Sequence, residues 1–446
     1  MKYRKFLLLL MAIVLSLCLS GCFVQSADEL YALPKQSDDY YELQTAINSI
    51  LVGDAQYSSP LSGANQQPVQ MSDLDGDGQE EAIVFVNTGG ARPLKTYIFA
   101  RNGDSYENLC TIEGDGSAFD RVEYAQMDGV PGMEIVIGRQ VSNQVLQSIG
   151  AYSIVNGQLV ELMSANYSEF TMVDLDQNNN EDLFLLRFDT EARTGFAELY
   201  RCVDGAMERE PEVSISVGVG AVRHITCGKL AEDRTAVFVG GLTDDSNVIT
   251  DVFTFRNELF TAVSSFNNLR LTSVPVRGYN VFATDIDSDG FIELPDVVQL
   301  PDIDPESSED DYFIIRWYNY SPGSGLTLKE NTYHNYANGW FLRLPDKLGT
   351  KFIVARGEEV SGTRGLSFYE NNGQGEAGDE LFTLFLFTGS GRNVSANYEG
   401  RFPVGSKGES TFAARLGSGA KHIGLTQEEL VSMFNFIRID WDSGET

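Results

Sequence analysis

Three nine-residue loops in this chain place oxygen-bearing side chains at alternating positions. Residues 73–81 read DLDGDGQEE, residues 174–182 read DLDQNNNED, and residues 285–293 read DIDSDGFIE. Acidic or amide side chains fall at positions 1, 3, 5 and 9 of each loop. Calcium is a hard cation that takes about six to eight oxygen ligands, and a tight loop can bring alternate side chains to one point. The spacing therefore predicts a calcium site in each loop, with position 7 giving its main-chain carbonyl.

An EF-hand begins with the same spacing but needs a bidentate acidic residue at position 12. Position 12 is Val84 in the first loop and Leu185 in the second, and both belong to strand-like runs. The EF-hand interpretation therefore fails for these two loops. In the third loop position 12 is Asp296, which leaves a helix-loop interpretation open there, although Pro295 argues against it.

Each loop belongs to a longer repeat, in which it is followed by an apolar, strand-like run. The first loop precedes Ala82–Val86, and the second precedes Leu183–Leu186. A related loop at 126–134 has the same place before an apolar run. It has Gln126 and Val130 where acidic residues are expected, so we expect no metal in this related loop.

The spacing of the repeat indicates a fold. The first, related and second loops start 53 and 48 residues apart, and the third starts 111 residues after the second. The longer gap spans two periods, and a polar turn within residues 227–239 marks the missing unit. Five units of about 50 residues therefore extend from Val69 to about Glu330. The strands expected in the first unit are Val69–Ser72, Ala82–Val86, Lys95–Ala100 and Tyr106–Ile112. Four-stranded units at this period are typical of β-propeller blades, because one blade cannot bury both faces alone.

The acidic loops resemble those of FG-GAP and VCBS repeats, the calcium-bearing blades of integrin-like propellers. The resemblance covers residues 67–333 and is specific in the loops rather than between them. Carried over by position, it implies about three structural Ca²⁺ ions, with Gln79, Asn180 and Phe291 bound through main-chain oxygen. The full set of implied ligands is Asp73, Asp75, Asp77, Gln79 and Glu81, then Asp174, Asp176, Asn178, Asn180 and Asp182, then Asp285, Asp287, Asp289, Phe291 and Glu293.

The N-terminus has the features of an export sequence. Three basic residues among the first five precede an apolar run at 6–19, which is short for a membrane span. The run ends in Leu-Ser-Gly-Cys at 19–22, which resembles the bacterial lipobox. We therefore expect a signal peptide over 1–21, a diacylated Cys22 and a tether over 22–36. The lipid would hold the mature protein on the outer face of the bacterial cytoplasmic membrane, at the cell surface.

The segments that flank the repeat are expected to differ from it. Residues 37–66 would form a helix and a linker, since apolar residues there recur at i, i+4, i+7 and i+8. Residues 336–446 would form a small α+β domain in which Thr426 and Glu429 make a helix capping box. A sixth blade over 337–389 is the competing assignment. The expected fold is therefore mainly β, a β-propeller of about five four-stranded blades, or six, followed by a small α+β domain.

The composition argues against several functions. The formal net charge is −32 at pH 7, which disfavours nucleic-acid binding because phosphate-binding surfaces are basic. The sequence contains no H-E-x-x-H, G-x-S-x-G or P-loop motif. Cys110, Cys202 and Cys227 lie far apart and are expected to be small buried hydrophobic residues, with a disulfide between two of them left open.

These features predict a cell-surface module that binds or scaffolds an extracellular protein or glycan. The alternative is an extracytoplasmic propeller enzyme, a hydrolase or lyase acting on a polysaccharide or peptide, and perturbed carboxylates or His224 lining a channel would favour it. His334 and His422 are expected to be packing or surface residues. A solute-binding lipoprotein is disfavoured, because residues 68–330 lack alternating strands and helices.

Overall fold

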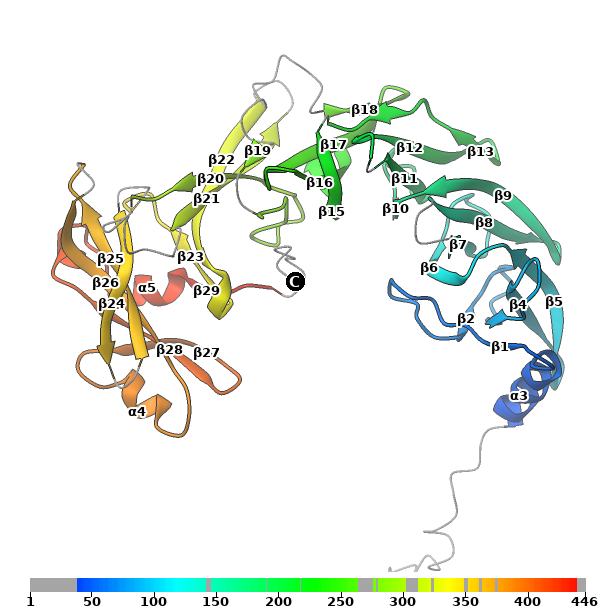
Figure 1. Cartoon of the computed structure of the whole chain (residues 1–446), viewed down its shortest axis with the longest axis horizontal. Helices are drawn as coiled ribbons and strands as arrows, with labels where there is room; N and C mark the ends of the chain where they lie inside the picture. Colours follow the sequence, from blue (N-terminus) through cyan, green and yellow to red (C-terminus); the bar gives the residue numbers. More distant parts are fainter. Residues whose placement is uncertain are drawn as a thin grey trace, which may run out of the picture. The chain divides into compact units, whose positions relative to one another are not determined.

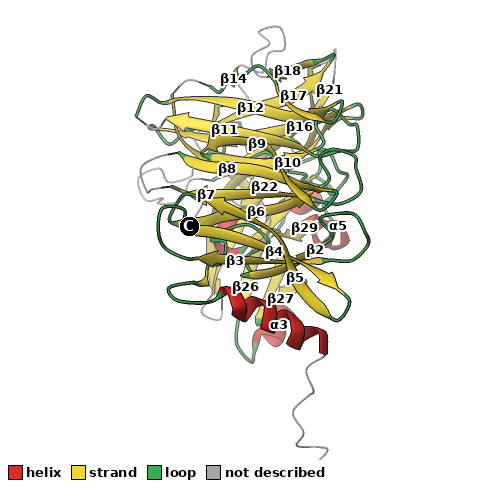
Figure 2. Cartoon of the chain, turned by 90° about the vertical axis from the view of Figure 1, so that its right-hand side faces the viewer, coloured by secondary structure: helices red, strands yellow, loops and turns green. Residues whose placement is uncertain are grey.

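The computed structural model describes residues 38–141, 146–189, 191–216, 218–263, 276–277, 280–301, 312–321, 325–348, 352–360, 363–373 and 376–438. The signal peptide, Cys22 and the tether predicted from the sequence lie outside these residues. Most of the described chain is β-strand, as Figure 2 shows, with α3 and α5 among its few helices. No helix within the described ranges is long and apolar enough to cross a membrane.

The chain forms two compact units, and unit 1 holds the described residues 38–59, 67–72 and 78–115. It combines helix α3 (Asp38–Ile50) with one antiparallel sheet. The strands of that sheet are β1 (Gln56–Tyr57), β2 (Val69–Ser72), β3 (Glu81–Asn87), β4 (Leu94–Asn102) and β5 (Ser105–Gly114). Ile47 of the helix is buried against Val84 and Phe99 of the sheet. The helix and the four strands expected from the sequence in this segment are therefore confirmed.

Unit 2 holds residues 60–66, 73–77 and the described residues from 116 onward. Its described strands form five antiparallel sheets, whose strands are labelled in Figure 1. The first sheet consists of β6 (Ala118–Ala125), β7 (Glu134–Gln140), β8 (Gln147–Val155) and β9 (Gln158–Tyr167). The second consists of β10 (Glu169–Val173), β11 (Asp182–Asp189), β12 (Thr194–Val203), β13 (Ala206–Arg209) and β14 (Val213–Ser214). The third consists of β15 (Val219–Ala231), β16 (Arg234–Thr243), β17 (Val248–Arg256), β18 (Leu259–Ala262) and β19 (Val276–Arg277).

Two further sheets follow in unit 2. One consists of β20 (Leu294–Gln299), β21 (Phe313–Ser321), β22 (Gly325–Asn335), β23 (Trp340–Leu344) and β29 (Phe434–Phe436). The other consists of β24 (Phe352–Val360), β25 (Thr363–Asn371), β26 (Ala377–Phe387), β28 (Ser410–Leu416) and β27 (Phe402–Lys407). The short helices are η2 (Tyr336–Asn338), α4 (Arg392–Ala396), η3 (Gly419–Lys421) and α5 (Gln427–Met433). Most neighbouring strands in these sheets are also neighbours in sequence, as in repeated antiparallel units.

Successive sheets of unit 2 pack through their apolar faces. In β11, Leu183 and Leu185 join the core cluster that contains Val136 of β7. Phe184 points to the opposite face and joins the cluster that contains Val237 of β16. Successive side chains of a strand face opposite sides, so a central strand covered on both faces needs an uninterrupted apolar run. This requirement explains why the second loop precedes such a run.

The expected domain boundary at residue 336 falls inside a sheet. β23 pairs with β22 on the far side of that boundary, and β29 from the C-terminal segment then pairs with β23. The final described strand, β29, directly follows α5. Backbone pairing with β23 therefore takes the final strand out of the expected separate domain. The N-cap half of the expected capping box is confirmed, because the Thr426 hydroxyl accepts a hydrogen bond from the Glu429 amide.

Candidate metal loops and a polar cavity

The second loop is the turn between β10 and β11. Val173 pairs with Asp182 at its base, and Gln177 and Asn179 have positive φ angles of 62° and 69°. The Asp174 carboxylate accepts hydrogen bonds of 3.0 Å from the main-chain amides of residues 178 and 179. The carboxylate at position 1 therefore holds the loop closed, and Asn179 takes a left-handed conformation, which asparagine adopts more readily than most residues.

Three carboxylates of the second loop converge. Oxygen atoms of Asp174, Asp176 and Asp182 lie within 4.8 Å of one another and could hold a metal ion. Asp182 is 1% exposed, and its Oδ2 accepts a 3.0 Å hydrogen bond from the Leu175 amide. Burial, together with the charge of Asp176, raises the pKa of Asp182 to about 7. A cation in the cluster would favour the ionised carboxylate and oppose this rise.

An arginine that the sequence analysis missed contacts this cluster. The Nη1 atom of Arg201, on β12, lies 2.7 Å from Asp176 Oδ2, and its Nη2 atom lies 2.7 Å from Glu210 Oε1. The guanidinium also lies over the Phe255 ring, 3.9 Å from its centroid. Arg201 therefore fixes one oxygen of Asp176 from outside the loop. Arg201 lies 25 residues from Asp176 in the sequence, so loop spacing alone could not have identified it.

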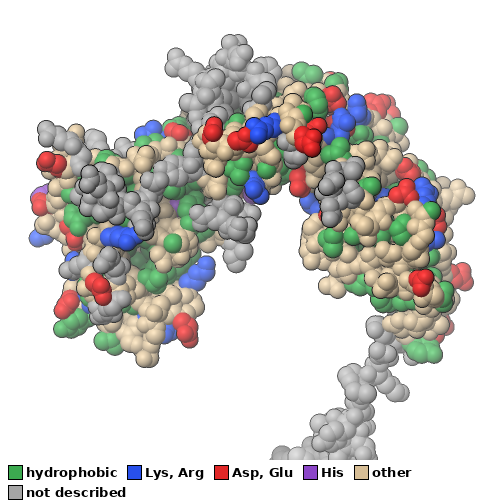
Figure 3. Space-filling model, viewed as in Figure 1, with side chains coloured by type: hydrophobic (Ala, Val, Ile, Leu, Met, Phe, Trp, Pro, Cys, Tyr) green, Lys and Arg blue, Asp and Glu red, His purple; other side chains and the backbone are tan. Residues whose placement is uncertain are grey.

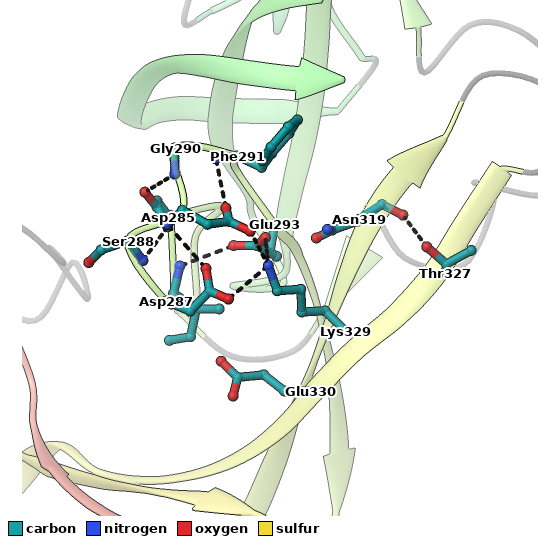
Figure 4. Close-up of polar contacts among 12 residues, drawn as sticks. Asp285, Asp287, Ser288, Gly290, Phe291, Glu293, Asn319, Thr327, Lys329 and Glu330 are labelled. Carbon is teal, nitrogen blue, oxygen red and sulfur yellow. Dashed lines mark hydrogen bonds and ion pairs between the residues drawn. The ribbon is translucent and has the colours of Figure 1, made fainter. Parts of the chain in front are cut away.

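The third loop repeats the same main-chain contacts (Figure 4). Asp285 accepts hydrogen bonds from the amides of Asp289 at 3.1 Å and Gly290 at 2.9 Å, which have the loop positions of residues 178 and 179. Glu293 Oε2 accepts a 3.1 Å bond from the Ile286 amide, as Asp182 does from Leu175. Glu293 is fully buried, and burial raises its pKa to about 7. The acid at position 9 therefore closes its own loop, in addition to its expected role as a ligand.

A lysine lies among the carboxylates of the third loop. Lys329 Nζ, from β22, is 2.7 Å from Asp287 Oδ2 and 3.6 Å from Glu293 Oε1, and it also contacts the Asp289 carboxylate. Figure 4 shows its side chain pointing into the loop. Oxygen atoms of Asp285, Asp287 and Asp289 also lie within 4.8 Å of one another and could hold a metal ion. The ammonium group of Lys329 already lies against two of these three carboxylates. The sequence analysis did not identify Lys329.

The first loop is divided between the two units, with residues 73–77 in unit 2 and Glu81 in unit 1. Within unit 2, Asp73 accepts a 2.8 Å hydrogen bond from the Gly76 amide, and Asp75 accepts a 3.1 Å bond from the Asp77 amide. Gly76 has a φ of 76°, and a Cβ there would lie 2.3 Å from the Pro131 carbonyl oxygen. Gly76 is therefore required by both its conformation and its surroundings. Glu81 is buried, while Gln79 is exposed.

The related loop at 126–134 closes with an amide instead of an acid at position 1. Gln126 Nε2 donates to the carbonyl oxygens of Val130 at 2.6 Å and Gly132 at 2.9 Å. Glu134 Oε2 accepts a 2.6 Å hydrogen bond from the Met127 amide, which repeats the position-9 contact of the other two loops. The Gln126 amide group therefore donates hydrogen bonds at position 1, where the carboxylates of the other loops only accept them, and the turn still closes.

A polar cavity of about 260 Å³ lies among the first strands of three successive sheets of unit 2. It is lined by Arg121, Glu169, Phe170, Thr171, Val222, Arg223, His224 and Ile225. Arg121 donates a 3.1 Å hydrogen bond to the Phe170 carbonyl and lies over the Phe170 ring. Burial, with the charge of Asp120, raises the pKa of Glu169. The cavity thus combines two guanidinium groups, an imidazole and a perturbed carboxylate.

The remaining histidines and cysteines have distinct surroundings. His334 is buried and stacks on Phe341, with ring centroids 5.0 Å apart. His422 Nδ1 lies 3.0 Å from Glu370 Oε1 and 3.7 Å from Asp379 Oδ2, in a largely exposed group that was not expected from the sequence. Within the described part of the chain, Cys110, Cys202 and Cys227 are not joined by a disulfide, and their burial is intermediate rather than complete as expected. The disulfide that the sequence left open is therefore not formed.

Comparison with known proteins gives no family. No protein-family model matches the chain, and no curated protein is significantly similar in sequence. Among solved structures, the exotype rhamnogalacturonan lyase YesX is 12% identical with a TM-score of 0.30, covering 73% of this chain and 70% of its own. A Bacillus licheniformis rhamnogalacturonan lyase is 8% identical, with a TM-score of 0.30 and coverage of 71% and 89%. A putative 6-phosphogluconolactonase from Bacteroides uniformis is 10% identical, with a TM-score of 0.31 and coverage of 73% and 94%. Similarity at this level assigns neither an activity nor a substrate to the chain.

Proposed function

We propose that this chain is a bacterial lipoprotein of the cell surface whose propeller-type β-sheet units are stabilised by calcium and bind an extracellular protein or glycan. The lipid on Cys22 would anchor it, and the calcium loops suit a compartment in which this ion is plentiful. The single observation that carries the calcium part is the convergence of Asp174, Asp176 and Asp182 around one point. The rest of the proposal follows from the export sequence and from the cavity in unit 2.

The second loop supports calcium through its electrostatics. Without a cation, the Asp182 carboxylate lies beside Asp176 in a buried place that disfavours its ionised form. Calcium takes oxygen ligands from carboxylates and amides, and Asn178 and Asn180 lie in the same loop. A bound ion would therefore stabilise the turn that joins β10 to β11. Structural stabilisation, rather than catalysis, is the expected role of this ion.

Calcium titration of the soluble mature chain tests the metal part. We expect Asp174→Asn to remove one bound calcium ion per chain, measured by isothermal titration calorimetry. For one such site, calcium at about 100 times its Kd would stabilise the folded state by about 2.7 kcal/mol, so the variant should lose the corresponding part of the calcium-induced rise in melting temperature. Asp128→Asn, in the related loop, is the matched control and should leave both values unchanged. Equal calcium binding by parent and Asp174→Asn would contradict the proposal.

The cavity in unit 2 supports a ligand site. Arg121 and Arg223 bring two guanidinium groups to one cavity in a chain whose formal net charge is −32. A guanidinium pairs with a carboxylate through two parallel hydrogen bonds, so a partner that carries carboxylates suits this cavity. Acidic glycans and acidic peptides both belong to that class.

A second candidate function, an extracytoplasmic enzyme acting on a polysaccharide or peptide, is favoured by the same cavity because Glu169 and His224 both line it. The two functions differ in one assay, in which the protein is incubated with polygalacturonate, hyaluronate and acidic peptides. A binding module would retain a ligand without altering it, and Arg223→Ala would weaken retention at least tenfold. An enzyme would release products, and Glu169→Gln would abolish their release. Neither retention nor products with any probe would count against both functions for this cavity.

A further inference from the structure

The cation of the third loop is the feature that the calcium proposal does not explain. We propose that Lys329 is a built-in cation of this loop, so that residues 285–293 fold around its ammonium group and need no calcium ion. The inference rests on the proposed function only where it contrasts this loop with the second one. The two loops would then perform the same structural task with different cations.

The contacts of the Lys329 ammonium group are those of a central cation. It touches the carboxylates of Asp287 and Asp289 and lies 3.6 Å from the buried Glu293 Oε1. In the second loop, the nearest basic group contacts only one of the three converging carboxylates, since Arg201 pairs with Asp176 there. A lysine ammonium is a compact charge with three donors, whereas a guanidinium is a broad, planar group. Lys329 can therefore occupy the centre of a loop, while Arg201 contacts its loop from one side.

The backbone of β22 directs Lys329 toward the loop. Along β21, Trp317 pairs with Glu330 and the next residue, Tyr318, pairs with Leu328. Lys329 is therefore the extra residue of a β-bulge, opposite no partner of its own. Bulges change the direction in which a side chain points. In the sheet that follows the second loop, β12 and β13 pair without a register shift from Tyr200 to Val203. This strand pair therefore has no β-bulge between those residues.

The ion pairs of Lys329 are partly shielded from water. The Lys329 side chain is 22% exposed and that of Asp287 is 20% exposed, so bulk water screens this contact only in part. The Glu293 side chain, whose Oε1 lies 3.6 Å from the ammonium group, is fully buried. The contacts that hold the ammonium group in the loop therefore differ from those of an exposed surface pair.

Calcium stoichiometry of variants in the mature chain tests this inference. Asp289→Asn in the parent should leave the number of bound calcium ions unchanged, because no ion occupies that loop. Lys329→Met, which keeps the length of the side chain and removes its charge, should bind one calcium ion more than the parent. The additional ion should disappear again in Lys329→Met combined with Asp289→Asn.

Two results would overturn the inference. One is the loss of a calcium ion from the parent on Asp289→Asn, which would mean that the loop binds calcium with Lys329 in place. The other is a folded Lys329→Met variant, verified by circular dichroism, that binds no additional ion. If Lys329→Met does not fold, the Asp289→Asn comparison in the parent still decides. Failure of the proposed function is separate, because it would appear as unchanged calcium binding in Asp174→Asn.

Discussion

Buried acids at position 9 of the loops accept hydrogen bonds from the backbone, in addition to any role in binding an ion. Glu134, Asp182 and Glu293 each accept a hydrogen bond from the amide of position 2 in the same loop. The loop spacing predicted the acidic cluster of the second loop but not this contact. Almost every residue type has a main-chain amide, so the sequence does not indicate which amide donates the hydrogen bond. Lys329 was also beyond prediction, since its role depends on a bulge 36 residues after Glu293. An acid at position 9 is therefore evidence for the turn itself as well as for a metal ligand.

A buried histidine gives a prediction at the same scale. Burial lowers the pKa of His334 to about 3 from an ordinary value of 6.5. The unfolded chain therefore binds a proton that the folded chain excludes, and the stability present above pH 6.5 is lost as the pH falls toward 3. We expect His334 to contribute a loss of about 1.4 kcal/mol in the free energy of unfolding for each pH unit below about 6.

Urea unfolding from pH 7 to pH 4 measures this slope. His334→Phe removes the titrating group in an aromatic setting and should flatten the slope by that amount. Tyr336→Phe, whose ring lies 5.3 Å from that of His334, leaves the imidazole in place and should keep the slope of the parent. An unchanged slope in His334→Phe would show that the imidazole has the same pKa in the folded and the unfolded chain, and would contradict the prediction.

At the scale of elements, hydrophobic patterning predicted the strands well, and pairing across long sequence distances was not predictable. The expected strands of unit 1 were found, because a run such as Ala82–Val86 is apolar on both faces. The boundary at 336 was wrong as a limit of the sheet. β29 joins β23 through the pairing of Leu342 with Phe434, two residues 92 positions apart. Neither β-strand propensity nor turn composition encodes which distant edge a short strand will pair with.

In the whole molecule, the acidic loops account for only part of the high negative charge. Acidic side chains on the face shown in Figure 3 lie beside Lys and Arg side chains rather than in one patch. Several acidic side chains of the described chain form ion pairs at the surface, such as Glu113 with Lys95 at 2.9 Å, and such pairs contribute about 0 to 1 kcal/mol each. The charge therefore suits a solvated extracellular surface, and the specific cation sites depend on local geometry.

Membrane attachment is tested on the full-length chain in a bacterial host. We expect the parent to partition into the detergent phase and to incorporate labelled fatty acid, because the thiol of Cys22 would be acylated. Cys22→Ser should remove both properties. Cys18→Ser is the matched control and should retain them, since Leu17 before Cys18 does not fit the small-residue pattern of a lipobox. Labelling that persists in Cys22→Ser would contradict the predicted anchor.

Anomalous X-ray diffraction from crystals grown in millimolar calcium tests the central claim most directly, because it locates the ion itself. The account predicts an anomalous peak enclosed by the carboxylates of Asp174, Asp176 and Asp182, and no peak beside Lys329. Absence of a peak at the second loop, with those three carboxylates ordered in the density, would contradict the claim that calcium stabilises this protein there.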